Sequence, residues 1–382
     1  MTSDTGRMVE LNIAIIDAEI IGKKKHRFPN LACLKLSAYH KHRNHNVTLK
    51  TDWSELSGFD KVYISKVFTK TIIPDNVLSL KNVNYGGSGF FFDNAPRLPN
   101  DIEHIMPDYT LYDDWITNCI AQGAKASGFS YYRDYSIGLA TRGCFRRCGF
   151  CINRNSTSSI AHSPIAEFHD PNRKKICLLD DNLFACADWK DILYQLQSTG
   201  KRFKFRQGLD LRLLDDEKCV ALSKCKYDGD IYFAFDNLKD AEVVEKNIKL
   251  LRHYCDRQTK SYVLCGYDSK GKYDQKFWAN DVSSLFERVK ILGRNGCLPY
   301  LARYERYKDS PYSSLYSYLN IWINYIPLFT TLSFMEWCDG RSAGAKRVAE
   351  DFLEKHPELQ KAFYERHYVK PEGKRTYVRK SM

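Results

Sequence analysis

The sequence predicts an α/β protein in three parts: a small doubly wound domain, a partial barrel of six strand–helix units, and a short helical extension. Apolar runs without polar alternation near the N-terminus are typical of parallel strands that are buried on both faces. Six further apolar runs recur with helical segments between them, and each ends in polar or glycine-rich residues. At 382 residues the chain is long enough for two or three domains.

The N-terminal part alternates strand and helix signals, as a doubly wound domain requires. Residues 11–16 form an apolar run that predicts a buried strand, and Pro29 stands where it would open the first turn of a helix. Residues 47–49 and 61–65 predict two more strands. Residues 83–92 hold three glycines among aromatic residues and predict a loop where backbone packs closely.

The second part contains the six strand–helix units. The candidate strands are residues 136–140, 175–179, 202–205, 230–235, 261–265 and 300–303. Functional groups on parallel sheets gather at the carboxyl ends of the strands, so the polar residues after each run are candidates for a site. The third part is predicted to be helical through residues 347–363 and then basic. The predicted domain limits are 1–128, 129–330 and 331–382.

Composition restricts the class of protein and its compartment. No apolar run reaches the roughly 18 residues that span a bilayer, and the first ten residues carry no apolar signal segment, so we expect a cytoplasmic protein. The 13 cysteines show no regular framework, which argues against a disulfide-stapled secreted protein. A net charge of +12 favours a polyanionic or phosphorylated partner, with a solvated basic face as the alternative.

One motif carries most of the chemical information: Cys144-x3-Cys148-x2-Cys151, with Phe150 before the third cysteine. Three thiolates can hold three irons of a [4Fe–4S] cluster and leave the fourth iron open to a bound ligand. Zinc usually takes four protein ligands in structural sites, and no fourth cysteine or histidine lies close by. A catalytic zinc with three ligands remains the alternative to the iron–sulfur cluster.

This motif, placed after the first strand of six strand–helix units, resembles the radical S-adenosylmethionine (SAM) superfamily over roughly residues 130–330. The N-terminal part resembles the Rossmann-like, cobalamin-binding domain of one branch. The resemblance implies a Rossmann-like domain before a partial (βα)6 TIM-type barrel. It also implies a [4Fe–4S] cluster that reductively cleaves SAM to a 5′-deoxyadenosyl radical, which abstracts hydrogen from a substrate. The electron would come from a flavodoxin- or ferredoxin-type donor.

The resemblance also suggests roles for residues at the strand ends. The candidate cofactor-binding residues are Phe150, Asp180, Asp181, Asn182, Arg206, Gln207 and Asp236. Phe150 resembles the aromatic residue near the adenine. The Asp180–Asn182 run stands where a methionine ammonium is bound in the superfamily, with helix capping as the alternative. Arg206 and Gln207 would meet a carboxylate or a substrate anion, and Asp236 would meet the ribose.

Cobalamin is allowed by the resemblance but is not favoured. The Asp-x-His-x-x-Gly motif that supplies a histidine ligand to cobalt is absent from the first 130 residues, which suggests a degenerate domain. Three functions stay open: a radical SAM enzyme acting on an unidentified anionic, nucleic-acid or peptide substrate; a cobalamin-dependent radical SAM methyltransferase; and a non-catalytic metal-cluster protein that binds nucleic acid. No second cysteine cluster points to an auxiliary iron–sulfur cluster, and no residue is assigned to the step on the substrate.

Overall fold

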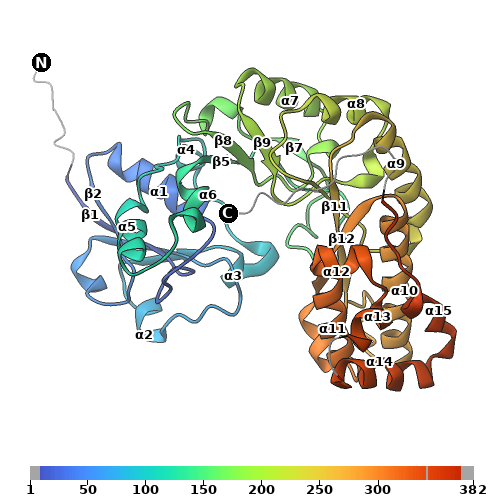
Figure 1. The fold of residues 1–382 in the computed structure, drawn as a ribbon. Coiled ribbons are helices and arrows are strands. Elements are labelled where there is room, and N and C mark those ends of the chain that lie inside the picture. The colour runs from blue at the N-terminus through green and yellow to red at the C-terminus, as the bar shows by residue number, and fades with distance from the viewer. Residues whose placement is uncertain (1–8, 341–342, 371–382) are drawn as a thin grey trace, which may run out of the picture. The chain divides into compact units, whose positions relative to one another are not determined.

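The computed structural model describes residues 9–340 and 343–370 (Figure 1). The chain divides into two compact units. The first unit holds the residues up to Asp181 together with Cys186–Phe203, and the second holds Asn182–Ala185 and the residues from Lys204 onward. The limits predicted after residues 128 and 330 stay predictions.

The regular elements are strands and helices in alternation, as the sequence predicts. The strands are β1 (Asn12–Asp17), β2 (Asn46–Leu49), β3 (Lys61–Ser65), β4 (Val83–Gly86), β5 (Tyr135–Gly138), β6 (Thr141–Arg142), β7 (Ile160–Ala161), β8 (Lys175–Leu178), β9 (Arg202–Phe205), β10 (Ile231–Ala234), β11 (Thr259–Cys265) and β12 (Cys297–Arg303). The helices are α1 (Leu31–Lys41), α2 (Asp75–Leu78), α3 (Ser88–Phe91), α4 (Asn100–Glu103), α5 (Asp113–Ala121), α6 (Ser130–Arg133), α7 (Trp189–Ser198), α8 (Asp216–Lys224), α9 (Ala241–Tyr254), α10 (Gln275–Arg294), α11 (Ser313–Asn324), α12 (Ile326–Thr331), α13 (Phe334–Asp339), α14 (Ala343–Lys355) and α15 (Gln360–Tyr364). The α/β class is confirmed.

The N-terminal sheet is parallel and has the order β2-β1-β3-β4. Successive side chains of β1 point to opposite faces and belong to two different hydrophobic clusters, one on each face of the sheet. Ile13 and Ile15 pack with residues of α1 and α5, while Ala14 and Ile16 pack on the other face with residues of β3 and α2. Burial on both faces explains why this strand reads as an unbroken apolar run.

Two N-terminal details differ from the sequence-based prediction. Residues 83–92 do not form a loop throughout, because β4 pairs with β3 and α3 follows it. An edge strand is held by backbone hydrogen bonds, such as that from Lys66 N to Gly86 O at 3.0 Å, which a glycine-rich sequence does not reveal. Helix α1 is capped by Asn30, whose side chain accepts from Ala32 N and Cys33 N. Pro29 therefore precedes the helix instead of opening its first turn.

The six strands of the second part lie in two three-stranded sheets, β5-β8-β9 and β10-β11-β12. The pairs β5–β8, β10–β11 and β11–β12 are parallel. In the second unit a single parallel bridge also joins Leu209 to Phe233 of β10. The predicted strands are confirmed to within a few residues, while their closure into a partial barrel stays a prediction.

The helical extension is confirmed with one correction. The helix predicted over residues 347–363 is broken: α14 ends at Lys355, a short 3-10 turn covers Pro357–Leu359, and α15 follows. Pro357 lacks the backbone N–H that a continuing helix would need, which accounts for the break. The predicted basic tail beyond Lys370 lies outside the described residues. Within the described ranges, no helix is both long and apolar enough to cross a membrane.

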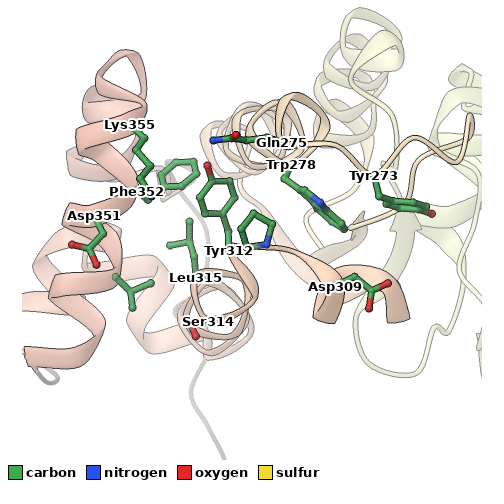
Figure 2. Close-up of a pocket in the computed structure, with 12 residues that line it drawn as sticks. Tyr273, Gln275, Trp278, Asp309, Tyr312, Ser314, Leu315, Asp351, Phe352 and Lys355 are labelled. Carbon is green, nitrogen blue, oxygen red and sulfur yellow. The ribbon is translucent and has the colours of Figure 1, made fainter.

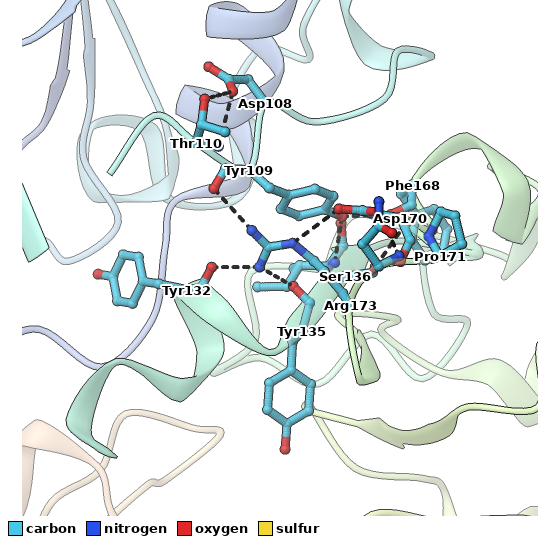
Figure 3. A network of polar contacts seen from close by, with 12 residues as sticks. Asp108, Tyr109, Thr110, Tyr132, Tyr135, Ser136, Phe168, Asp170, Pro171 and Arg173 are labelled. Carbon is cyan, nitrogen blue, oxygen red and sulfur yellow. Dashed lines mark hydrogen bonds and ion pairs between the residues drawn. The ribbon is translucent and has the colours of Figure 1, made fainter. Parts of the chain in front are cut away.

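A buried arginine ties β5 to the segments around it within the first unit (Figure 3). The Arg173 guanidinium donates to the backbone oxygens of Tyr132, Tyr135 and Tyr109, the last at 3.0 Å. It also lies over the Tyr109 ring, 4.1 Å from the centroid. Because three separate segments supply acceptors to one cation, Arg173 fixes the strand that leads to the cysteine motif.

Candidate metal centre

The three cysteines lie on one long loop that follows β5, which we call the cysteine loop (residues 143–159). Strands β6 and β7 close its base, with Thr141 opposite Ala161 and Arg142 opposite Ile160 in an antiparallel pair. Cys144, Cys148 and Cys151 are all half-buried on this loop. The structure therefore places the motif where the sequence predicts it, after the carboxyl end of the first strand of the second part.

The start of the cysteine loop needs a glycine. Gly143 has φ +89°, and a Cβ atom there would lie 2.4 Å from Ser158 O. Such a contact is far inside van der Waals distance, so any larger residue would displace the loop. The next backbone amide, Cys144 N, donates to Ser156 Oγ at 3.2 Å, and that hydroxyl donates to Ser158 O. The first cysteine is thus held against the returning strand of the loop.

Cys151 interacts electrostatically with Cys144 and with Asp181. The pKa of Cys151 is raised, first by burial and then by the negative charges of Asp181 and Cys144. A bound iron would reverse this shift, because thiolates are the form that iron–sulfur clusters bind. Three neighbouring, half-buried thiols on one loop fit the donor set of a cluster. Among the described residues, no group of three or more His, Cys, Asp or Glu side chains is arranged to hold a single metal ion.

Two carboxylates at the end of β8 support the cysteine loop. Asp180 is 1% exposed and accepts from Ala140 N, Thr141 N and the Thr141 hydroxyl, at 2.6 to 3.2 Å. Burial raises its pKa to about 7, although these hydrogen bonds oppose the rise. Asp181 accepts from Gly143 N at 2.8 Å and from Asn153 Nδ2 at 2.6 Å. In the structure Asp180 holds the segment just before the cysteine loop, and Asp181 holds Gly143 and Asn153 within it. The assignment of these two aspartates to SAM stays a prediction.

The remaining predicted site residues divide between the two units. Phe150 is half-buried on the cysteine loop, in the first unit. In the second unit, Asn182 is buried and contacts Asp210, with Nδ2 and Oδ2 3.4 Å apart. Arg206 and Gln207 follow β9 and are exposed. Their assignment to SAM stays a prediction.

Asp236 follows β10 and is part of a buried polar group in the second unit. Its Oδ1 accepts from Leu264 N at 3.0 Å, and its pKa is raised mainly by burial. The Arg288 guanidinium, which is 1% exposed, donates to the backbone oxygens of Phe235 and Asp236. One carboxylate oxygen of Asp236 is therefore used to join neighbouring strands.

Sequence reasoning missed the residues that anchor the flanks of the cysteine loop. Arg142 donates to Glu103 Oε1 at 2.6 Å, and Asn155 Nδ2 donates to Asp93 Oδ2 at 2.8 Å. Glu103 and Asp93 precede the motif by tens of residues and stand in no recognisable pattern. No local signal could have identified them, because the contact exists only after the chain has folded.

The carboxyl edge between β1 and β3 forms a second polar centre in the first unit. We call it the closed edge (Asp17, Asn30, Ser65 and Tyr112), and all four residues are buried. The Tyr112 hydroxyl donates to Asp17 Oδ2 at 2.9 Å, and Asn30 Nδ2 donates to Ser65 Oγ at 2.8 Å. Burial raises the pKa of Asp17 to about 6. The strand order reverses between β1 and β3, where ligands of open parallel sheets bind.

A cavity of about 460 Å³ lies within the second unit (Figure 2). The N-terminal end of α10, α11 and α14 line it (Figure 2). Trp278 and Tyr312 are among its aromatic lining residues, and Lys355 lines it from α14. None of its lining residues is a predicted site residue. The cavity and the cysteine loop are thus separate features of the chain.

Comparisons with known proteins give a likeness of fold. No protein-family model matches the chain, and no curated protein matches it. Among solved structures, it is similar to the radical SAM methyltransferase TsrM from Kitasatospora setae, solved with cobalamin and a [4Fe–4S] cluster bound. The two are 11% identical, the match covers 77% of this chain and 75% of that one, and the TM-score is 0.50. The chain therefore has the fold of a radical SAM methyltransferase.

A second structure of TsrM, with tryptophan substrate and the SAM analogue aza-SAM bound, is 12% identical and has a TM-score of 0.48. That match covers 76% of this chain and 72% of that one. The expectation that cobalamin is not favoured is not borne out, because the solved structure with the shared fold carries cobalamin.

Proposed function

We propose that the chain is a radical SAM enzyme whose [4Fe–4S] cluster is held by Cys144, Cys148 and Cys151. The observation that carries the proposal is the placement of three neighbouring thiols on one loop after β5, closed at its base by β6 and β7. The fold shared with a radical SAM methyltransferase supports it. When bound, the cluster supplies one electron, which cleaves SAM to methionine and a 5′-deoxyadenosyl radical.

The described side chains would hold the cluster and SAM in place and would not themselves react. Asp180 and Asp181 hold the backbone at the start of the cysteine loop, which would limit the positions open to the three thiols before a cluster binds. Phe150, on the same loop, is the candidate contact for the adenine. The candidates for the rest of SAM are Asn182, Arg206, Gln207 and Asp236. Asp180 and Asp181, which hold the loop and the segment before it, remain candidates for the methionine ammonium of SAM.

The composition of the chain bears on the substrate class. The net charge of +12 favours an anionic or nucleic-acid substrate, and a peptide is the competitor. A low-potential flavodoxin- or ferredoxin-type protein is the proposed electron donor. We assign no catalytic residue for the step on the substrate.

The test is anaerobic reconstitution with iron and sulfide, followed by dithionite and SAM. We expect a brown protein that produces 5′-deoxyadenosine in step with methionine. A protein that binds a cluster, retains SAM and never cleaves it would reject the enzyme. Tight binding of a labelled oligonucleotide by such a protein would favour the non-catalytic nucleic-acid-binding alternative.

The second candidate function is cobalamin-dependent methyl transfer. The solved structure with a similar fold carries cobalamin, and the N-terminal parallel sheet reverses its strand order at the closed edge, where ligands of such sheets bind. In the described part of the chain, histidines of the N-terminal part already have partners: His26 Nδ1 contacts the Tyr132 hydroxyl at 3.0 Å, and His40 contacts His45 at 2.8 Å. Cobalamin would therefore have to bind without a histidine ligand. Cobalamin that survives gel filtration, with transfer of a labelled methyl group from SAM to a substrate, would favour this function, and loss of cobalamin on the column would reject it.

A further inference from the structure

The carboxylate of Glu103, the last residue of α4, binds two positively charged side chains in the interior of the first unit. Glu103 is 6% exposed, and its Oε1 accepts from Lys35 Nζ at 2.8 Å and from Arg142 at 2.6 Å. Lys35 comes from α1 and is 3% exposed. Burial alone would raise the pKa of Glu103, but its hydrogen bonds and these two positive charges hold it well below the usual range. Glu103 is thus a permanent anion between two cations.

His162, just after β7, completes the group. Its Nε2 lies 3.1 Å from Glu103 Oε1 and 3.1 Å from Arg142 Nε. A ring nitrogen offers either a proton or a lone pair, so it cannot serve both neighbours at once. Arg142 can only donate and ionised Glu103 can only accept, so the tautomer of His162 decides which of the two it binds, while the guanidinium donates to Glu103 in either case.

The hydrogen bonds of the Arg142 guanidinium also restrict the start of the cysteine loop, because Gly143 and Cys144 follow Arg142 directly in the chain. The far end of the loop is held in a matching way, since Arg154 Nε and Asn155 Nδ2 both donate to Asp93. Glu103 and Asp93 both come from the N-terminal part of the first unit. Two carboxylates from outside the motif therefore fix the segments that enter and leave it.

We propose that Glu103 is a positioning residue for the iron–sulfur cluster, acting through Arg142, with Asp93 as its counterpart at the other end of the cysteine loop. The inference rests on the proposed function, because it concerns the cluster assigned there. Without the Glu103 charge, Lys35 and Arg142 would be two like charges in a buried site, and one would have to move. Arg142 is the one attached to the cysteine loop, so the thiols would lose their preset arrangement.

The first measurement uses the metal-free full-length protein. We expect Glu103→Gln to speed hydrogen exchange of the backbone amides of residues 142–157 by about tenfold or more, because local opening of the loop becomes easier. Alkylation of Cys144, Cys148 and Cys151 by iodoacetamide should accelerate with it. The matched control is Glu167→Gln, which removes a carboxylate that contacts His104 at 2.9 Å but does not touch Arg142.

The second measurement follows reconstitution. Iron per chain should fall by at least half in Glu103→Gln, and the electron paramagnetic resonance signal of the reduced cluster should change its response to SAM. SAM cleavage per cluster should fall about tenfold. Glu167→Gln should match the wild type in all three. Wild-type exchange, alkylation and cluster signal in Glu103→Gln would overturn the proposal, whereas a wild type that never cleaves SAM would reject the proposed function and leave the apo-protein comparison decisive.

Two further variants decide the question if Glu103→Gln does not fold. Arg142→Lys keeps the positive charge but replaces the two guanidinium nitrogens that contact Glu103 and His162 by a single ammonium nitrogen. Asp93→Asn removes the negative charge that binds Arg154 and Asn155 on the other side of the cysteine motif. We expect both to keep the wild-type circular dichroism and to show faster exchange within residues 142–157. Wild-type exchange in both variants would overturn the proposal.

Discussion

The cysteine loop and the closed edge both follow the carboxyl ends of parallel strands in the first unit, yet they differ in how far their functional side chains are buried. At the closed edge, Tyr112 bonds to Asp17 and Asn30 bonds to Ser65, the side chains of Asp17, Asn30 and Tyr112 also accept from backbone amides, and all four residues are buried. At the cysteine loop, Asp180 and Asp181 accept from backbone amides as well, but the thiols stay half-buried. The loop therefore leaves its thiols within reach of a ligand, whereas the side chains of the closed edge meet one another.

The largest expected effect comes from removing a thiol of the cysteine loop. Cys148→Ala should lose the cluster and lower SAM cleavage at least about a hundredfold, because two thiolates cannot hold the cluster in place of three. Iron analysis and 5′-deoxyadenosine formation measure this. Cys119→Ala, at a buried cysteine of α5, is the control and should keep its cluster. A brown, active Cys148→Ala protein would place the cluster elsewhere.

Removing a carboxylate that supports the loop should have the next largest effect. Asp181→Asn retains one acceptor oxygen, so it can serve Gly143 N or Asn153 Nδ2 but not both. We expect cluster affinity to fall about tenfold, as for other residues that orient metal ligands, with thermal stability little changed. The control is Asp134→Asn, which breaks an ion pair with the exposed Lys174. Equal iron retention by the two variants during titration with a chelator would contradict the prediction.

At the closed edge, we expect Asp17 to make the free energy of unfolding depend on pH. The pKa of Asp17 is raised from 3.8 to about 6 in the folded protein, so folding favours its protonated form. The wild type should therefore lose stability as the pH rises from about 4 to about 6, by up to about 3 kcal/mol. Urea unfolding across this range should show a loss that is smaller in Asp17→Asn by up to that amount, because Asp180, whose pKa is also raised, titrates in both proteins. Parallel curves for the two proteins would contradict it.

The smallest effect is expected at Ser65. Ser65→Ala removes the acceptor of Asn30 Nδ2 and should lower the free energy of unfolding by about 1 kcal/mol. Cluster content should not change, because the hydroxyl has no contact with the cysteine loop. A loss of cluster in this variant would show that the two edges are coupled, and the contrast between them would fail.

Much of the fold could be predicted because its signals are local. Unbroken apolar runs indicated the parallel strands, and polar residues after them indicated the edge where a site forms. The prediction failed at β4, which forms through backbone pairing with β3, and at Pro357, where one residue breaks the helix between α14 and α15. Hydrogen bonds along an edge strand involve no side-chain pattern that a sequence can show.

The three cysteines, their spacing and their place after β5 could be predicted from the sequence, because each depends on neighbours along the chain. The residues that hold the cysteine loop depend on how the chain folds. Glu103 and Arg142 are 39 positions apart and meet because α4 and β6 pack together. Asp180 and Asp181 were identified from sequence by position, but their hydrogen bonds to residues about 40 positions earlier assign them to the loop backbone. The residue type decides what a side chain can bind, and the packing of the folded chain decides which partner lies within reach.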